Sequence, residues 1–161
     1  MLTLQILRHA NTERNSASGR DFDRDLSPEG FFQRHAINTH FKELTHFPEQ
    51  IFVSSAKRTV TTYEGIREFM KTTAVYSDDL YLASLDNLID FMEDKASEKS
   101  VLLVGHNDGI SELVSYLTGD YLSLSTGGYI EMELHINQWN MLTSGCASVV
   151  HHFEPSVASP F

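Results

Sequence analysis

Cysteine, proline and long apolar runs are all scarce in this chain of 161 residues. Its single cysteine, Cys146, cannot form an internal disulfide, so nothing in the sequence requires an oxidising compartment, and a small buried residue is expected there. No apolar run approaches the ~18 residues of a membrane-spanning helix. The first apolar stretch reaches Arg8 too early to be a secretory signal. We therefore expect a soluble protein of the cytoplasm with no membrane contact.

Basic residues are also scarce, at 12 Lys and Arg against 22 Asp and Glu, which gives a net charge of −10. This balance argues against nucleic acid as a partner, because such binding needs basic surface. The deficit is uneven. Residues 1–67 hold nine basic and eight acidic residues, for a net +1, whereas residues 68–161 hold three lysines and 14 acids, for −11. A small cationic pocket in an acidic body would bind one phosphate and repel polyanions.

The length and composition indicate one folded domain over residues 1–161. A chain of this size can bury a sizeable core, and the 41% hydrophobic fraction excludes a disordered acidic tail. There is no internal repeat, and no linker separates two halves.

Strand and helix patterns alternate along the first two-thirds of the chain, and two strands follow at the end. This order predicts a three-layer α/β/α sandwich whose central sheet is mostly parallel, with an antiparallel edge. Ser27 is expected to cap the first helix, with Pro28 at its first position. Strands are expected at 2–7, 50–54, 101–104, 129–136 and 147–153, and helices at 28–44, 56–70, 82–96 and 109–117.

Arginine and histidine side chains follow three of these strands directly. Arg8 and His9 end the first strand, Arg58 lies in the first helical turn after the second, and His106 follows strand 101–104. Ligands in open α/β sheets bind beyond the carboxyl ends of the strands. Helix starts favour anions, and arginine matches phosphate oxygens. The pattern predicts a phosphate pocket that contains an imidazole.

Four motifs carry a resemblance to the histidine phosphatase (phosphoglycerate mutase-like) superfamily, in that family's order. The similarity runs from residue 2 to about residue 155. The short length and the Asp-Phe-Asp-Arg stretch resemble the SixA-type phosphohistidine phosphatases more than the longer mutases. The motifs are Leu7-Arg8-His9-Ala10-Asn11-Thr12, Asp23-Arg24-Asp25-Leu26-Ser27-Pro28-Glu29-Gly30, Ser54-Ser55-Ala56-Lys57-Arg58-Thr59 and Val104-Gly105-His106-Asn107.

The resemblance implies a phosphatase that needs no metal ion or other cofactor. His9 would be the nucleophile and would carry a phosphohistidine intermediate, which divides one displacement into two easier steps. Cationic and polar neighbours would stabilise the transferring phosphoryl group. Arg24 could equally belong to a solvated network in its loop. The implied phosphate or substrate contacts are Arg8, Asn11, Arg24, Arg58, His106 and Asn107.

A general acid is missing from the pattern. One branch of the family has an Asp directly after the late histidine, where this chain has Asn107, with Asp108 one place on. The mutase-like branch has a Glu after the second helix, where residues 76–83 contain none. Asp79 and Asp108 are the candidate acids, although Asp108 also suits a helix N-cap. The absence of a general acid from the pattern fits a phosphohistidine or phosphoramidate substrate, whose nitrogen leaves readily once protonated.

Three functions stay open at this point. The leading one is hydrolysis of phosphohistidine in a phosphorylated protein, or of a small phosphorylated metabolite. The alternatives are a phosphomutase and a non-catalytic module that binds a phosphorylated ligand. No metal site is expected. His151 and His152 point to opposite faces of a strand, and surface positions are expected for His35, His40 and His46.

Overall fold

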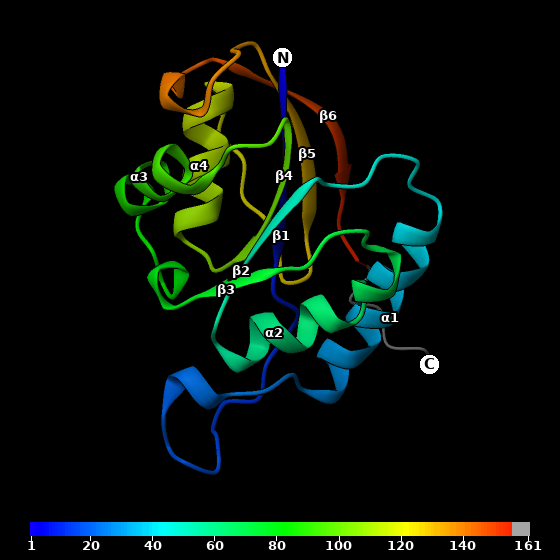
Figure 1. The fold of residues 1–161 in the computed structure, drawn as a ribbon. Helices are drawn as coiled ribbons and strands as arrows, with labels where there is room; N and C mark the ends of the chain where they lie inside the picture. The colour runs from blue at the N-terminus through cyan, green and yellow to red at the C-terminus, as the bar shows by residue number, and fades with distance from the viewer. Residues whose placement is uncertain (156–161) are drawn as a thin grey trace.

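The computed structural model describes residues 1–155 and contains a six-stranded mixed sheet in the order β3-β2-β4-β1-β5-β6 (Figure 1). Four strands, β3, β2, β4 and β1, pair in parallel, and β5 pairs antiparallel with both β1 and β6. The predicted fold class, with an antiparallel edge, is confirmed. The strands are β1 Leu2–Arg8, β2 Gln50–Ser54, β3 Val75–Ser77, β4 Ser100–Gly105, β5 Tyr129–Leu134 and β6 Ala147–Phe153.

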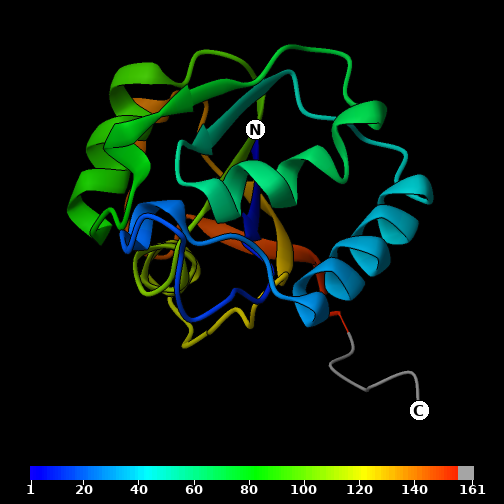
Figure 2. The ribbon, with the colours of Figure 1, turned by 90° about the horizontal axis from the view of Figure 1, so that it is seen from below.

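Helices cover both faces of this sheet (Figures 1 and 2). α1 and α2 pack on one face, and α3 and α4 on the other. The helices are α1 Pro28–Lys42, α2 Lys57–Glu64, α3 Leu85–Lys95 and α4 Gly109–Thr118, and short 3₁₀ turns cover Asp21–Asp23, Arg67–Phe69, Asp78–Leu80 and Trp139–Met141. No helix among residues 1–155 is long and apolar enough to cross a membrane.

The core consists of two apolar clusters separated by the sheet. Leu4 and Ile6 of β1 belong to the cluster under α3 and α4, whereas Leu7 belongs to the cluster under α1 and α2. β4 is apolar and buried on both faces, as its sequence predicted. Cys146 is buried and is a free cysteine, as expected.

The start of α1 confirms the expected cap and fixes the neighbouring loop. The Ser27 hydroxyl accepts a hydrogen bond from the Gly30 amide at 3.0 Å, and Pro28 occupies the first helical position. Gly30 lies so close to the loop after β1 that an added Cβ would be 2.0 Å from the Asn11 carbonyl oxygen. The helix therefore holds that loop against the end of the sheet.

Several predicted boundaries were wrong, for local reasons. The second helix ends at Glu64 rather than near residue 70, with Gly65 at its C-cap and a separate 3₁₀ turn at Arg67–Phe69. The third begins at Leu85, where Ser84 caps it. β3 was not predicted because its three residues are mostly exposed at a sheet edge. The expected domain extends to residue 161, and its last six residues lie outside the described range.

Candidate active site

A hollow of about 320 Å³ lies at the carboxyl ends of β1, β2 and β4. Segments from distant parts of the sequence meet here, including the loop after β1, which lies below the sheet in Figure 1. All seven residues predicted to bind phosphate or to act as nucleophile line this hollow. They are Arg8, His9, Asn11, Arg24, Arg58, His106 and Asn107; Thr12, Asp21, Leu82 and Thr126 complete the lining.

His9 presents an unprotonated ring nitrogen to this pocket. Its Nδ1 lies 2.7 Å from the Ala10 carbonyl oxygen, which can only accept, so Nδ1 carries the proton. Nε2 is then left with its lone pair. Burial, together with charge repulsion from Arg58, Arg8 and Arg24, lowers the pKa of His9 to about 3. The ring is therefore neutral at pH 7, as a nucleophile must be.

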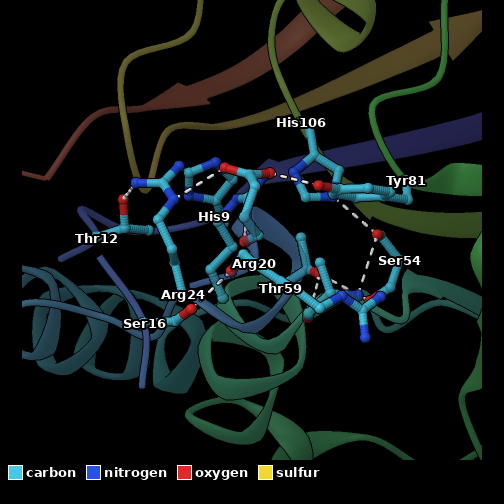
Figure 3. A network of polar contacts seen from close by, with 12 residues as sticks. His9, Thr12, Ser16, Arg20, Arg24, Ser54, Thr59, Tyr81 and His106 are labelled. Carbon is cyan, nitrogen blue, oxygen red and sulfur yellow. Dashed lines mark hydrogen bonds and ion pairs between the residues drawn. The ribbon is translucent and has the colours of Figure 1, made fainter. Parts of the chain in front are cut away.

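His106 faces His9 across the pocket, with 5.4 Å between the ring centroids (Figure 3). It follows β4 and is 2% exposed. Its Nε2 is 2.7 Å from the Ser54 hydroxyl oxygen. Burial lowers the pKa of His106 to about 3, helped by repulsion from His9 and Arg58. The pocket thus contains two neutral imidazoles.

Arg8 and Arg58 are both held by hydrogen bonds from the terminal nitrogens of their guanidinium groups. Arg8 donates from one terminal nitrogen to the Leu124 carbonyl at 3.0 Å. Arg58 donates to the Asp21 backbone carbonyl at 2.9 Å and to its carboxylate at 3.0 Å. The Nε of each arginine is buried and has no hydrogen-bond partner within the described chain, and the same holds for His106 Nδ1. Three pocket-lining residues thus each have one buried nitrogen without a hydrogen-bond partner among residues 1–155.

Asp21 and Tyr81 are parts of the site that the sequence analysis missed. The Asp21 carboxylate bridges Arg58 and the Arg24 Nε, and it accepts a short hydrogen bond from the Tyr81 hydroxyl. The Tyr81 bond, and then the two arginines, hold the pKa of Asp21 well below its usual range. The Tyr81 ring lies edge-on to His106, 5.6 Å away. The only feature of the sequence that pointed to Asp21 was its place three positions before Arg24.

Arg24 takes part in both of the arrangements that the sequence left open. It lines the pocket, and it also donates to the Thr12 hydroxyl at 2.9 Å and the Glu13 carbonyl at 2.8 Å. Its loop network therefore fixes the guanidinium at the pocket wall.

The two asparagines also hold the pocket loops. The Asn11 side-chain oxygen accepts from the Ser27 hydroxyl at 2.7 Å, and the backbone N–H of Asn11 donates to the Gln33 side-chain oxygen. Asn107 donates to the Leu124 carbonyl at 2.9 Å and accepts from Ser111. Both side chains have polar partners within the protein, so their first role is to position the loops around His9.

Neither candidate general acid lies in the His9 pocket. Asp79 lines a separate hollow with Asp90 and Asp94. Asp108 lines a groove with Glu112 and does not line the His9 pocket. Asp108 is the N-cap residue of α4, as predicted, but its side chain forms no capping hydrogen bond. Within residues 1–155, Asp21 is the only carboxylate that lines the pocket.

The other histidines are placed away from this site. His35 and His46 are exposed, as expected. The expected surface position of His40 was wrong, because its ring stacks on Phe153 and its Nε2 is 2.7 Å from that of His151. Among the residues that the structure describes, no group of three or more His, Cys, Asp or Glu side chains could hold a metal ion.

A neutral buried histidine with a free nitrogen, surrounded by arginines at the strand ends of an α/β sheet, is an arrangement suited to phosphoryl transfer. Comparison with known families agrees with this class. Residues 4–81 match the family model described as the histidine phosphatase superfamily (branch 1). Over these residues the chain is similar to the histidine phosphatase superfamily.

Individual relatives are distant in sequence but close in fold. An uncharacterized chloroplastic protein of Arabidopsis thaliana is 27% identical over 148 residues, which cover 84% of this chain and 68% of that protein. A proposed phosphohistidine phosphatase SixA from Agrobacterium tumefaciens matches at a TM-score of 0.81 and 23% identity, over 96% of this chain and 98% of that one. A protein histidine phosphatase SixA complexed with tungstate matches at 0.77 and 17% identity, over 96% and 97% of the two chains. These structures share the fold of this chain.

Proposed function

We propose that this protein is a phosphatase of the SixA type that works without a metal ion and removes phosphoryl groups from phosphohistidine through a covalent intermediate on His9. The observation that carries the proposal is that Arg8, Arg58 and His106, each with a buried nitrogen that has no partner among residues 1–155, line one pocket with a neutral His9. A buried donor without a partner costs roughly 1–3 kcal/mol. Phosphoryl oxygens would supply the missing acceptors.

The reaction divides into two displacements. In the first, the lone pair of His9 Nε2 forms a bond to phosphorus while the bond from phosphorus to the leaving atom breaks. The leaving atom keeps that electron pair and takes a proton from solvent. In the second, water attacks the phosphohistidine, releasing inorganic phosphate and restoring His9. In both steps the donors from Arg8, Arg58 and His106 stabilise charge on the non-bridging oxygens.

The charge of the pocket matches one phosphoryl group. Arg8, Arg24 and Arg58 contribute three positive charges, Asp21 contributes one negative charge, and both histidines are neutral. The resulting +2 balances a phosphoryl dianion. The acidic remainder of the chain would repel further phosphates.

The lack of an acid favours a nitrogen leaving group over an alkoxide. Asp21 is the pocket carboxylate, and its lowered pKa keeps it ionised, so it cannot donate a proton at neutral pH. The imidazole of a phosphohistidine leaves well once solvent has protonated it. The similar SixA protein from Agrobacterium tumefaciens, which is described as a phosphohistidine phosphatase, supports the same substrate. A phosphorylated protein is therefore the proposed partner, and a small phosphorylated metabolite is the second choice.

The test compares release of inorganic phosphate from a phosphohistidine-containing protein domain with release from a generic aryl phosphate. Wild type should act faster on the phosphohistidine domain, and His9→Ala should be inactive on both substrates. His35→Ala, which removes an exposed histidine of α1, is the matched control and should retain full activity. Equal activity of His9→Ala and wild type would overturn the proposal. Phosphoryl exchange between isomers that outpaces phosphate release would indicate a mutase, and binding without turnover would indicate a binding module.

A further inference from the structure

Ser54 contacts the reaction pocket only through another side chain. It is the last residue of β2, is fully buried, and does not line the hollow. Its hydroxyl oxygen lies 2.7 Å from Nε2 of His106, which follows the neighbouring strand β4 (Figure 3). A serine at this place can decide which ring nitrogen of His106 carries the proton.

The hydrogen-bond partners of the Ser54 hydroxyl determine whether it donates to His106 or accepts from it. The Ser54 oxygen is also 3.4 Å from the Ala56 amide, which can only donate. Within residues 1–155, His106 Nε2 is the one acceptor recorded for the Ser54 hydroxyl proton. Leaving a buried hydroxyl proton unpaired would cost roughly 1–3 kcal/mol. The hydroxyl therefore donates to Nε2, whose lone pair is then occupied.

A neutral imidazole with an accepting Nε2 carries its proton on Nδ1. The Nδ1 atom of His106 is buried and has no partner within the described chain, and His106 lines the pocket. We propose that Ser54 is a positioning residue that holds His106 in the Nδ1–H tautomer, so that the ring offers a proton rather than a lone pair to the phosphoryl oxygen. The kinetic consequence of this proposal rests on the proposed function.

The two histidines then present opposite hydrogen-bonding groups to the pocket, a lone pair from His9 and an N–H from His106. The Ala10 carbonyl holds the proton on His9 Nδ1 and leaves Nε2 as a lone pair. The Ser54 hydroxyl holds a lone pair on His106 Nε2 and leaves Nδ1 as a donor. If His106 adopted its other tautomer, a lone pair would face a negatively charged oxygen and repel it. Two identical side chains, 5.4 Å apart, are thus given the two different tasks of attack and charge stabilisation.

The direct test is the tautomeric state of each histidine, read from long-range proton–nitrogen NMR correlations of protein labelled with ¹⁵N-histidine at pH 7.5. The signals are assigned by comparison with His106→Gln. Wild type should show His106 protonated on Nδ1. Ser54→Ala should shift His106 toward a mixture of tautomers, while His9, held by a carbonyl, should be unchanged. Ser55→Ala removes the adjacent hydroxyl, which forms no side-chain hydrogen bond with residues 1–155, and should match wild type.

A wild-type His106 protonated on Nε2 would overturn the proposal, as would an unchanged His106 tautomer in folded Ser54→Ala. The wild-type spectrum decides the question even if Ser54→Ala fails to fold. These measurements need no turnover, so they can fail separately from the proposed function.

In kinetics with the phosphohistidine domain, Ser54→Ala should lower kcat/KM by roughly 10- to 100-fold, since loss of a full oxyanion donor costs about 10²–10³. Ser54→Thr keeps the hydroxyl and should recover most of that loss, and Ser55→Ala should lose nothing. A Ser54→Ala enzyme as active as wild type would show that the tautomer of His106 has no role in the reaction.

Discussion

The two buried histidines should make the stability of this protein depend strongly on pH between 7.5 and 5. Burial lowers the pKa of both His9 and His106 to about 3, from an ordinary value of 6.5. The unfolded chain therefore binds a proton at each position below pH 6.5, while the folded chain does not. The stabilisation is fully present above pH 6.5 and is lost as the pH falls toward the folded-state pKa.

The expected size follows from linkage. Each histidine lowers the unfolding free energy by about 1.4 kcal/mol per pH unit below 6.5. At pH 5 the loss is about 2 kcal/mol for each ring and about 4 kcal/mol for both. That is a large part of the ~5–15 kcal/mol that stabilises a typical domain.

Urea unfolding, followed through the fluorescence of the single tryptophan, measures this loss. Trp139 is buried and donates to the Glu98 carbonyl at 2.8 Å, so its signal should change on unfolding. His106→Gln should lose about half of the pH dependence. His35→Gln, at an exposed position, should lose none. His40, whose pKa burial also lowers, contributes equally in all three proteins. A flat profile from pH 7.5 to 5, or an unchanged slope in His106→Gln, would refute the reasoning.

Two further predictions concern the arginine anchor and the packing of α1. Arg58→Lys should weaken inhibition by vanadate by roughly tenfold or more. The reason is that an ammonium group cannot form both guanidinium bonds to Asp21 and still offer a donor to the pocket. An unchanged inhibition constant would contradict the assignment of Arg58 to phosphate binding. Gly30→Ala should destabilise the protein by about 3 kcal/mol or more in urea unfolding, since its Cβ would be 2.0 Å from the Asn11 carbonyl oxygen. The control Gly19→Ala has open space and only an unfavourable φ of +79°, so it should cost about 1 kcal/mol; equal losses would argue against the close contact.

The parts of the fold that the sequence predicted well are those with a strong local signal. β2 and β6 have the expected bounds because turn residues delimit apolar runs. β3 lacked such a signal, since it is three residues long and has two exposed positions. The second helix was overestimated because apolar spacing continues past Gly65 into a separate 3₁₀ turn at Arg67–Phe69.

The site residues that the sequence predicted also had a strong local signal, and those that it missed did not. Arg8, His9 and His106 were predictable because they directly follow strands whose carboxyl ends must meet at one edge of a parallel sheet. The contacts of Asp21 were not predictable, because they join residues 37 and 60 positions apart through a loop whose path no local pattern determines. Asp79 was misplaced for a related reason: closeness to a site segment in sequence does not fix the direction of a side chain.

The central claim is that His9 Nε2 attacks phosphorus. The most direct measurement is rapid quenching of the enzyme with ³²P-labelled phosphohistidine domain, followed by peptide mapping of the acid-labile label and assignment of the phosphorylated nitrogen by ³¹P NMR. We predict a single labelled residue, His9, phosphorylated on Nε2, and no label on the protein in His9→Ala. Label on His106 or any other residue, or phosphate release with no labelled intermediate at the shortest quench times, would contradict this mechanism.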